Sequence, residues 1–273
     1  MQPEILLDVL VLSEDSGKDG AAVLKAVMRK ALAHVFPGDT RRMSFTPADD
    51  STAHWVHAAR WKCEAPVGRG QAGQHQRDRR DLLRTIATFL LKRNPLGMVA
   101  FHYDGDTVWS CRADAETPAQ FQAIIKPKIE TLLADPTQGA PRRGNVPLAT
   151  RLEGDALDAA LARLVEVVPH YSMEAWLCLN TAELRRLAAV DAVPLAVHTK
   201  LADWTSDPAS LQEIHKIKDD GWPHDKHNLS LARNAWSASQ AAEHSDSFAD
   251  LVTKLRNLDD VRAVLAPPPA APE

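Results

Sequence analysis

Two aspartates separated by a single glycine follow a short apolar run in the middle of the chain. The run covers residues 97–103, and Asp104 and Asp106 come directly after it. A continuous apolar run of this length is typical of a buried strand in a parallel sheet. Ligands of open α/β sheets bind beyond the carboxyl ends of the strands, and Mg²⁺ takes one or two carboxylates together with water and phosphate oxygens. The pattern therefore indicates a metal site, with an Asp-Gly turn between two strands as the alternative interpretation.

Two glutamates also follow predicted strands. Glu14 comes just after the apolar run 4–12, and Glu174 follows the run 164–168, in the first turn of a helix for which Ser172 is the predicted cap. Either glutamate alone could serve only to stabilise a helix dipole. In a doubly wound sheet, however, acids at strand ends converge on one crevice, where several carboxylates repel one another unless a cation neutralises them. We therefore expect Mg²⁺, or Mn²⁺ in its place, to be held by four acids: Glu14, Asp104, Asp106 and Glu174.

The elements that would position these acids alternate between strands and helices. The run 4–12 is followed by a helical pattern over 21–34, whereas residues 36–73 show an irregular pattern and the chain beyond Asn180 is helical. This alternation predicts an α/β fold with a Rossmann-like, mainly parallel central sheet. We expect an α/β domain over 1–180, a helical C-terminal region packed on it over 181–262, and a disordered Pro/Ala tail over 263–273.

The sequence argues against several familiar kinds of site. The Gly17-Lys18 pair is not a phosphate-binding P-loop, because no glycine stands five residues before Gly17 and Asp19 replaces the required Ser or Thr. No apolar run approaches the ~20 residues of a membrane span, and the N-terminus lacks the features of a signal peptide. Scattered cysteines argue against a zinc site and a disulfide framework, and they favour a cytoplasmic location; they are Cys63, Cys111 and Cys178.

The overall charge does not indicate a nucleic-acid-binding protein. The 273 residues carry a formal net charge of −4, so nucleic acid would have to be bound by local basic groups. The basic segment 77–80 leads into a helix, where solvated charge is the alternative interpretation. The candidate contacts to nucleic acid are Arg77, Arg79, Arg80, Arg142, Arg143 and Lys226.

The three acid-bearing segments resemble the TOPRIM family, which is named for topoisomerases and primases and includes the OLD nucleases. Residues 9–14 (VLVLSE) with the glycine-bearing loop after them are similar to the glutamate motif of that family, and residues 98–106 (MVAFHYDGD) to its Asp-x-Asp motif. Residues 170–177 (HYSMEAWL) resemble a segment of stand-alone, OLD-like TOPRIM proteins of phage-defence loci. One departure is the distance of about ninety residues between Glu14 and Asp104, which implies an insertion at about 36–75.

The resemblance implies a Mg²⁺-dependent nuclease that cleaves phosphodiester bonds in DNA or RNA, with transfer RNA among the candidate substrates. Asp104 and Asp106 would hold the metal, Glu14 would act as general acid or base or bind a second metal, and Glu174 would complete the shell. Lys18 would stabilise negative charge on the phosphate. The resemblance also implies an antiviral defence effector, restrained by a partner ATPase or sensor subunit or by homo-oligomerisation. His102, His170 and His224 could carry protons, but in a chain with eleven histidines any one of them can be incidental.

Two other functions stay open. Residues 103–108 are close to the nucleophile loop of haloacid-dehalogenase-type phosphatases, in which Asp104 would attack the phosphate and Asp106 would be the acid. That family also needs a later Lys and an acid pair, and the nucleophile strand normally opens the domain, whereas about a hundred residues precede it here; the nominees are Lys216 or Lys218 with Asp219 and Asp220. The second alternative is a catalytically inactive regulatory or scaffold subunit that keeps the TOPRIM fold.

Overall fold

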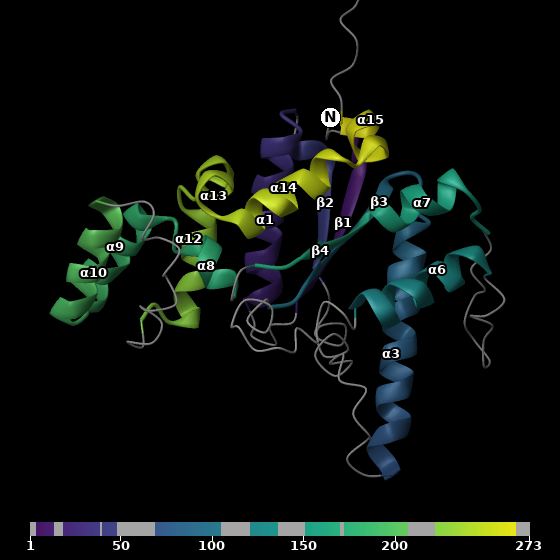
Figure 1. Ribbon diagram of the computed structural model, residues 1–273, viewed down its shortest axis with the longest axis horizontal. Helices are drawn as coiled ribbons and strands as arrows, with labels where there is room; N and C mark the ends of the chain where they lie inside the picture. The colour runs from purple at the N-terminus through teal and green to yellow at the C-terminus, as the bar shows by residue number, and fades with distance from the viewer. Residues whose placement is uncertain are drawn as a thin grey trace, which may run out of the picture.

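Four parallel strands form one sheet in the structure, which is a computed structural model (Figure 1). The strands are β1 Leu7–Ser13, β2 Met43–Pro47, β3 Leu96–His102 and β4 Leu164–Val167. This arrangement confirms the predicted α/β class with a parallel, Rossmann-like sheet. The structure describes residues 4–13, 19–38, 40–47, 69–104, 121–135, 151–169, 172–206 and 222–265, with the backbone alone over 69–79.

The order of the strands across the sheet is β2-β1-β3-β4. The chain passes from β1 outward to β2 and then crosses back to place β3 on the other side of β1. The order therefore reverses between β1 and β3, which pair in register from Leu7–Leu96 to Ser13–His102. In open α/β sheets the ligand crevice lies at such a reversal, beyond the carboxyl ends of the two strands.

Helices cover both faces of the sheet. Every residue of β1 and β3 is buried, and their side chains alternate between two apolar clusters. Val9, Val11 and Ala100 pack toward α1 (Gly20–Val35), whereas Leu10 and Leu12 pack toward the opposite layer. That layer consists of α3 Arg69–Leu90, η2 Phe121–Ile125, α6 Lys126–Ala134 and α7 Asp155–Ala162. Each fully buried Val or Leu contributes about 1.5–3 kcal/mol, so burial of these strands on both faces stabilises the fold.

Gly97 is required where the end of α3 meets β3. A Cβ atom built on Gly97 would lie 1.8 Å from the backbone oxygen of Phe89, a separation that no side chain tolerates. The missing side chain lets the chain leave α3 and enter β3 within a few residues. The amino end of β3 is thereby set against β1, with Gly97 opposite Asp8.

The C-terminal half is helical and shares its core with the sheet. Trp176 is fully buried, lies 5.0 Å edge-to-face from Phe248, and accepts a hydrogen bond at its backbone oxygen from the Trp236 indole. The helices of this half are α8 Met173–Leu177, α9 Thr181–Asp191, α10 Leu195–Ser206, η5 Asp225–His227, α12 Asn228–Arg233, α13 Ala238–His244, α14 Asp246–Arg256 and α15 Asp259–Leu265; η1 (Thr40–Arg42) precedes β2. Of these helices, α12, α13 and α14 contact α1 and so lie on the α1 face of the sheet.

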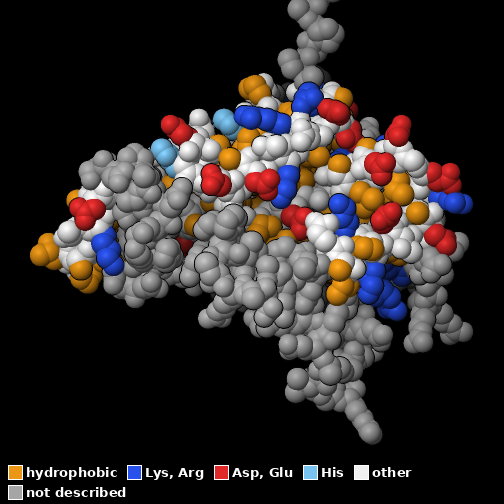
Figure 2. All heavy atoms as spheres, in the orientation of Figure 1, with side chains coloured by type: hydrophobic (Ala, Val, Ile, Leu, Met, Phe, Trp, Pro, Cys, Tyr) orange, Lys and Arg blue, Asp and Glu red, His pale blue; other side chains and the backbone are white. Residues whose placement is uncertain are grey.

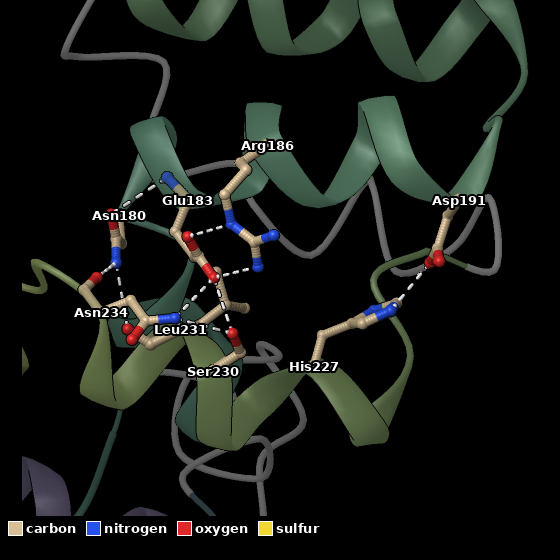
Figure 3. A network of polar contacts seen from close by, with 8 residues as sticks. All are labelled: Asn180, Glu183, Arg186, Asp191, His227, Ser230, Leu231 and Asn234. Atoms are coloured by element: carbon tan, nitrogen blue, oxygen red, sulfur yellow. Dashed lines mark hydrogen bonds and ion pairs between the residues drawn. The ribbon is translucent and has the colours of Figure 1, made fainter.

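A polar network joins α9 to α12 (Figure 3). Glu183 is 7% exposed and accepts hydrogen bonds from Arg186, Ser230 and Asn234. The hydrogen bond from Arg186 is the largest cause that lowers the pKa of this carboxyl, to about 2. Asn180 caps α9 by accepting from the Glu183 backbone N–H. A second tie lies at the other end of α9, where the His227 Nε2 atom is 2.8 Å from Asp191 Oδ2, so α12 is held at two points.

Some element boundaries differ from the sequence-based expectations. The stretch 36–73, predicted to be irregular and treated as part of an insertion, contains β2 and the beginning of α3. In the helical region beyond Asn180, Ala235 has a φ of 54° and Ser237 caps a new helix, so α12 and α13 are separate. The final helices begin after Ser245 and continue to Leu265, beyond the predicted start of the tail at 263. Residues 266–273 lie outside the described residues.

Candidate metal centre

The carboxyl ends of β1 and β3 lie side by side. Ser13, the last residue of β1, pairs with His102, the last residue of β3. Glu14 is the next residue after Ser13, and Asp104 follows two residues after His102. Of the five predicted catalytic residues the structure describes Asp104 and Glu174. Glu14, Lys18 and Asp106 lie outside the described residues, so the predicted convergence of four acids stays a prediction.

Asp104 is the exposed end of a chain of polar side chains. Its side chain is 32% exposed, and Oδ1 lies 3.5 Å from Nε2 of His102, which has no exposed surface. The other ring nitrogen of His102, Nδ1, is 3.2 Å from the hydroxyl of Ser13. Sequence analysis noted His102 only as one of several histidines and did not single out Ser13. Both residues end adjacent strands, but the register that joins them cannot be read from either strand alone.

Glu174 lies in α8, which follows β4 at the carboxyl edge of the sheet (Figure 1). Its Oε2 accepts a hydrogen bond of 2.6 Å from the Ser172 hydroxyl, and its Oε1 accepts one of 2.8 Å from the Asn228 side-chain amide. Ser172 occupies the predicted cap position, but its hydroxyl makes no capping bond to the backbone and holds the glutamate instead. The carboxylate is therefore oriented by one residue before α8 and by one from α12.

Asn228 supplies an oxygen beside Glu174. The residue is 9% exposed, and its buried Oδ1 accepts no hydrogen bond from any residue that the structure describes. A buried acceptor without a donor is unfavourable unless water or an ion satisfies it. Amide and carboxylate oxygens are the hard donors that Mg²⁺ and Mn²⁺ take in proteins. Glu174 and Asn228 thus present neighbouring oxygens of the kind that such a metal takes, and Asp104 presents another after the end of β3.

A second acid stands on the other face of the same edge. The Tyr103 hydroxyl donates a 2.6 Å hydrogen bond to Oε1 of Glu166 in β4, and the Gln122 amide donates one of 2.6 Å to Oε2. Burial, followed by the negative charge of Glu166, raises the pKa of the Tyr103 phenol, which therefore stays protonated as a donor. Glu166 was not among the predicted site residues. Its two hydrogen bonds tie β4 to the end of β3 and to η2.

Among the described basic residues, Arg80 and Lys226 lie close to acidic side chains. Arg80 is 3.6 Å from Asp81, and the Lys226 ammonium is 3.8 Å from Asp191. Figure 2 shows blue and red side chains interspersed over this face of the molecule, with a small blue group near α6 and α3. Lys126 and Lys128 are exposed on α6, which packs against α3. Arg142 and Arg143, like the side chains of Arg77 and Arg79, lie outside the described residues, so their contacts to nucleic acid stay predictions.

Within the described ranges no three His, Cys, Asp or Glu side chains gather closely enough to hold a metal, and two of the predicted ligands, Glu14 and Asp106, lie outside those ranges. Among the helices that the structure describes, none combines the length and apolar character needed to cross a membrane. Comparisons with protein-family models, with curated proteins and with solved structures found no match.

Proposed function

We propose that this chain is a Mg²⁺-dependent nuclease that hydrolyses phosphodiester bonds at the carboxyl edge between β1 and β3. The observation that supports the proposal is the reversal of strand order at this point. It sets Asp104 beside the end of β1, from which Glu14 continues. Acids at such a crevice suit a divalent cation and a phosphate, because the cation neutralises carboxylates that would otherwise repel one another and the phosphate.

The proposed roles follow from where each residue stands. Asp104 and Asp106 hold the cation, and Glu174 completes the oxygen donors from the side of β4, oriented by Ser172 and Asn228. Glu14 accepts a proton from the attacking water or binds a second cation, and Lys18 balances charge on the phosphate. When bound, the metal supplies Lewis acidity and an activated water. An anti-phage role under a partner ATPase or sensor, or in a homo-oligomer, belongs to the same proposal.

The test is hydrolysis by the purified full chain with Mg²⁺, with Mn²⁺ and with EDTA. DNA, RNA, transfer RNA and a generic phosphomonoester serve as separate substrates. We expect metal-dependent cleavage of a nucleic acid, reduced at least about 100-fold by Asp104→Asn. Glu130→Gln, which changes an exposed acid on α6, is the matched control and should leave the rate unchanged.

Three outcomes would contradict the proposal. Cleavage that persists in EDTA, or in the Asp104→Asn variant, would remove the metal site from the reaction. Hydrolysis of the phosphomonoester alone would favour the haloacid-dehalogenase-type alternative. Metal binding without hydrolysis of any substrate would favour the regulatory or scaffold alternative.

A further inference from the structure

We propose that His102, held by Ser13, is a positioning residue that orients the Asp104 carboxylate for metal binding. This inference rests on the proposed function, because it assigns Asp104 to a metal. It adds Ser13 and His102, which lie within the two strand motifs but were not among the predicted ligands. Neither residue is proposed to touch the substrate or the metal.

The three side chains form a path from the core to the surface. Ser13 is 2% exposed, His102 has no exposed surface, and the Asp104 side chain is 32% exposed. Because side chains alternate along a strand, Ser13 and His102 stand on the same face of the sheet as Val11 and Ala100, the face that α1 covers. The imidazole is therefore enclosed by packed side chains that restrict its rotation. Only the carboxylate end of the path reaches solvent.

The geometry relates the ring to the carboxylate on one side and to the hydroxyl on the other. Nε2 of His102 lies 3.5 Å from Asp104 Oδ1, which is an ion-pair contact rather than a hydrogen bond, and both atoms are buried. A carboxylate oxygen only accepts, so a proton on Nε2 would make this contact attractive. The Ser13 hydroxyl, which can donate or accept, lies 3.2 Å from Nδ1 and restricts rotation of the ring. Hydrogen bonds to a ligating carboxylate fix its orientation, and loss of such a partner typically weakens metal affinity about 10–100-fold.

The same three residue types form the catalytic triad of many hydrolases, but this geometry does not suit that role. In a triad the serine oxygen attacks the substrate and must therefore be accessible, with the carboxylate behind the histidine. Here Ser13 is the buried member and Asp104 is the exposed one. The order from surface to core is reversed, so the group available for chemistry is the carboxylate.

Three substitutions at His102 test the inference in the full chain. The side-chain nitrogen of Gln extends to the level of imidazole Nε2, whereas that of Asn ends at the level of Nδ1, and Leu removes both. We expect the Mn²⁺ affinity, measured by calorimetry, to fall about 10–100-fold in His102→Leu and His102→Asn. His102→Gln should restore most of the affinity because it can still donate to Asp104. Ser13→Ala should have a smaller effect in the same direction.

Melting temperatures in EDTA separate positioning from simple loss of packing. His102→Gln and His102→Asn are both polar replacements of a buried ring, so they should lose similar stability while differing in Mn²⁺ affinity. Equal affinities for these two variants would overturn the inference, and the comparison holds even if His102→Leu fails to fold. Wild-type binding that is lost in Asp104→Asn but unchanged in the His102 variants would refute the positioning role alone. Absence of Mn²⁺ binding by the wild type would contradict the proposed function as well.

Discussion

Two carboxylates that lie near opposite ends of strand β1 differ in their surroundings. Near the amino end, Asp8 is 10% exposed and accepts from Ser44, Thr46 and Lys92, the last at 2.8 Å. Near the carboxyl edge, Asp104 of the neighbouring segment is 32% exposed, and its neighbour His102 is an imidazole that is itself buried. The first carboxylate is neutralised by a cation within the chain. The second lies within reach of solvent and of an external cation.

The contrast separates a carboxylate that stabilises the fold from one that is available for function. A buried carboxylate must be paired, because an unpaired charge in the interior is strongly destabilising. Asp8 meets that requirement through donors from β2 and from the segment between α3 and β3. Asp104 lies beyond the last residue of β3, and its side chain is 32% exposed. The four predictions that follow test this division.

The largest effect is expected on activity. Asp104→Asn keeps the shape of the side chain and removes the charge that would bind the metal, so hydrolysis should fall at least about 100-fold. Asp106→Ala should abolish activity in the same way. Neither change should unfold the protein, because removing one acid from a mutually repelling cluster relieves repulsion. Circular dichroism in EDTA checks the fold, and an unfolded variant would instead assign these residues to a structural turn.

Asp8→Ala should produce the opposite result, a loss of stability without a specific loss of metal binding. The substitution leaves the Lys92 ammonium and two hydroxyls without their acceptor, and we expect the free energy of unfolding to fall by about 2–4 kcal/mol. Asp104→Ala should change it by less than about 1 kcal/mol. Urea unfolding of both variants in EDTA measures the difference. Equal losses would abolish the distinction between the two ends of the sheet.

A third carboxylate, Glu183, should stabilise the fold as Asp8 does, and the stability that it contributes should depend on pH. Its folded-state pKa is about 2, below the ordinary value of 4.5, chiefly because Arg186 donates to it. Because the folded pKa is depressed, the stabilisation is present above pH 4.5 and is lost as the pH falls toward 2. With allowance for the exposed Arg186, Glu183→Gln should lower stability by about 2 kcal/mol at pH 7. The difference from wild type should shrink steadily in urea titrations below pH 4.5.

The smallest expected effect concerns nucleic acid. Each phosphate contact contributes roughly one unit to the dependence of log affinity on log salt. Replacing Arg79 and Arg80 by Glu should therefore weaken binding and reduce the salt slope, with Mg²⁺ affinity almost unchanged. Arg256→Glu, on α14, is the control of equal charge type. If titrations over several salt concentrations gave one slope for all three proteins, α3 would carry only solvated charge.

The strands located from the sequence are β1, β3 and β4, each of which is an apolar run. β1 and β3 are continuous apolar runs because helices cover both of their sides. Such runs can be recognised as buried strands from the sequence alone. β2 escaped detection because it is five residues long, lies at the edge of the sheet and uses Ser44 and Thr46 to bind Asp8. The role of these polar residues can be recognised only once their partner, Asp8, is known.

The candidate site likewise contains residues that could be proposed from the sequence and residues that could not. Asp104 and Glu174 could be proposed from their place after apolar runs, since position along the chain is a local property. The Ser13–His102 contact joins residues 89 apart in sequence, and the Asn228–Glu174 bond joins residues 54 apart. Pairings over such distances depend on strand register and helix packing, which a single sequence does not display. The predicted ligands could therefore be proposed, and the residues that orient them could not.

The bond between Asn228 and Glu174 also affects when the site can form during synthesis. Chains emerge from the ribosome from the amino end and fold progressively, so β1, β3 and β4 are available well before α12. Glu174 acquires its hydrogen bond from Asn228 only after a further 54 residues have been added. A nascent or prematurely ended chain would hold the acids of the sheet without this last support. The full arrangement at the carboxyl edge therefore forms only once the chain has been synthesised through α12.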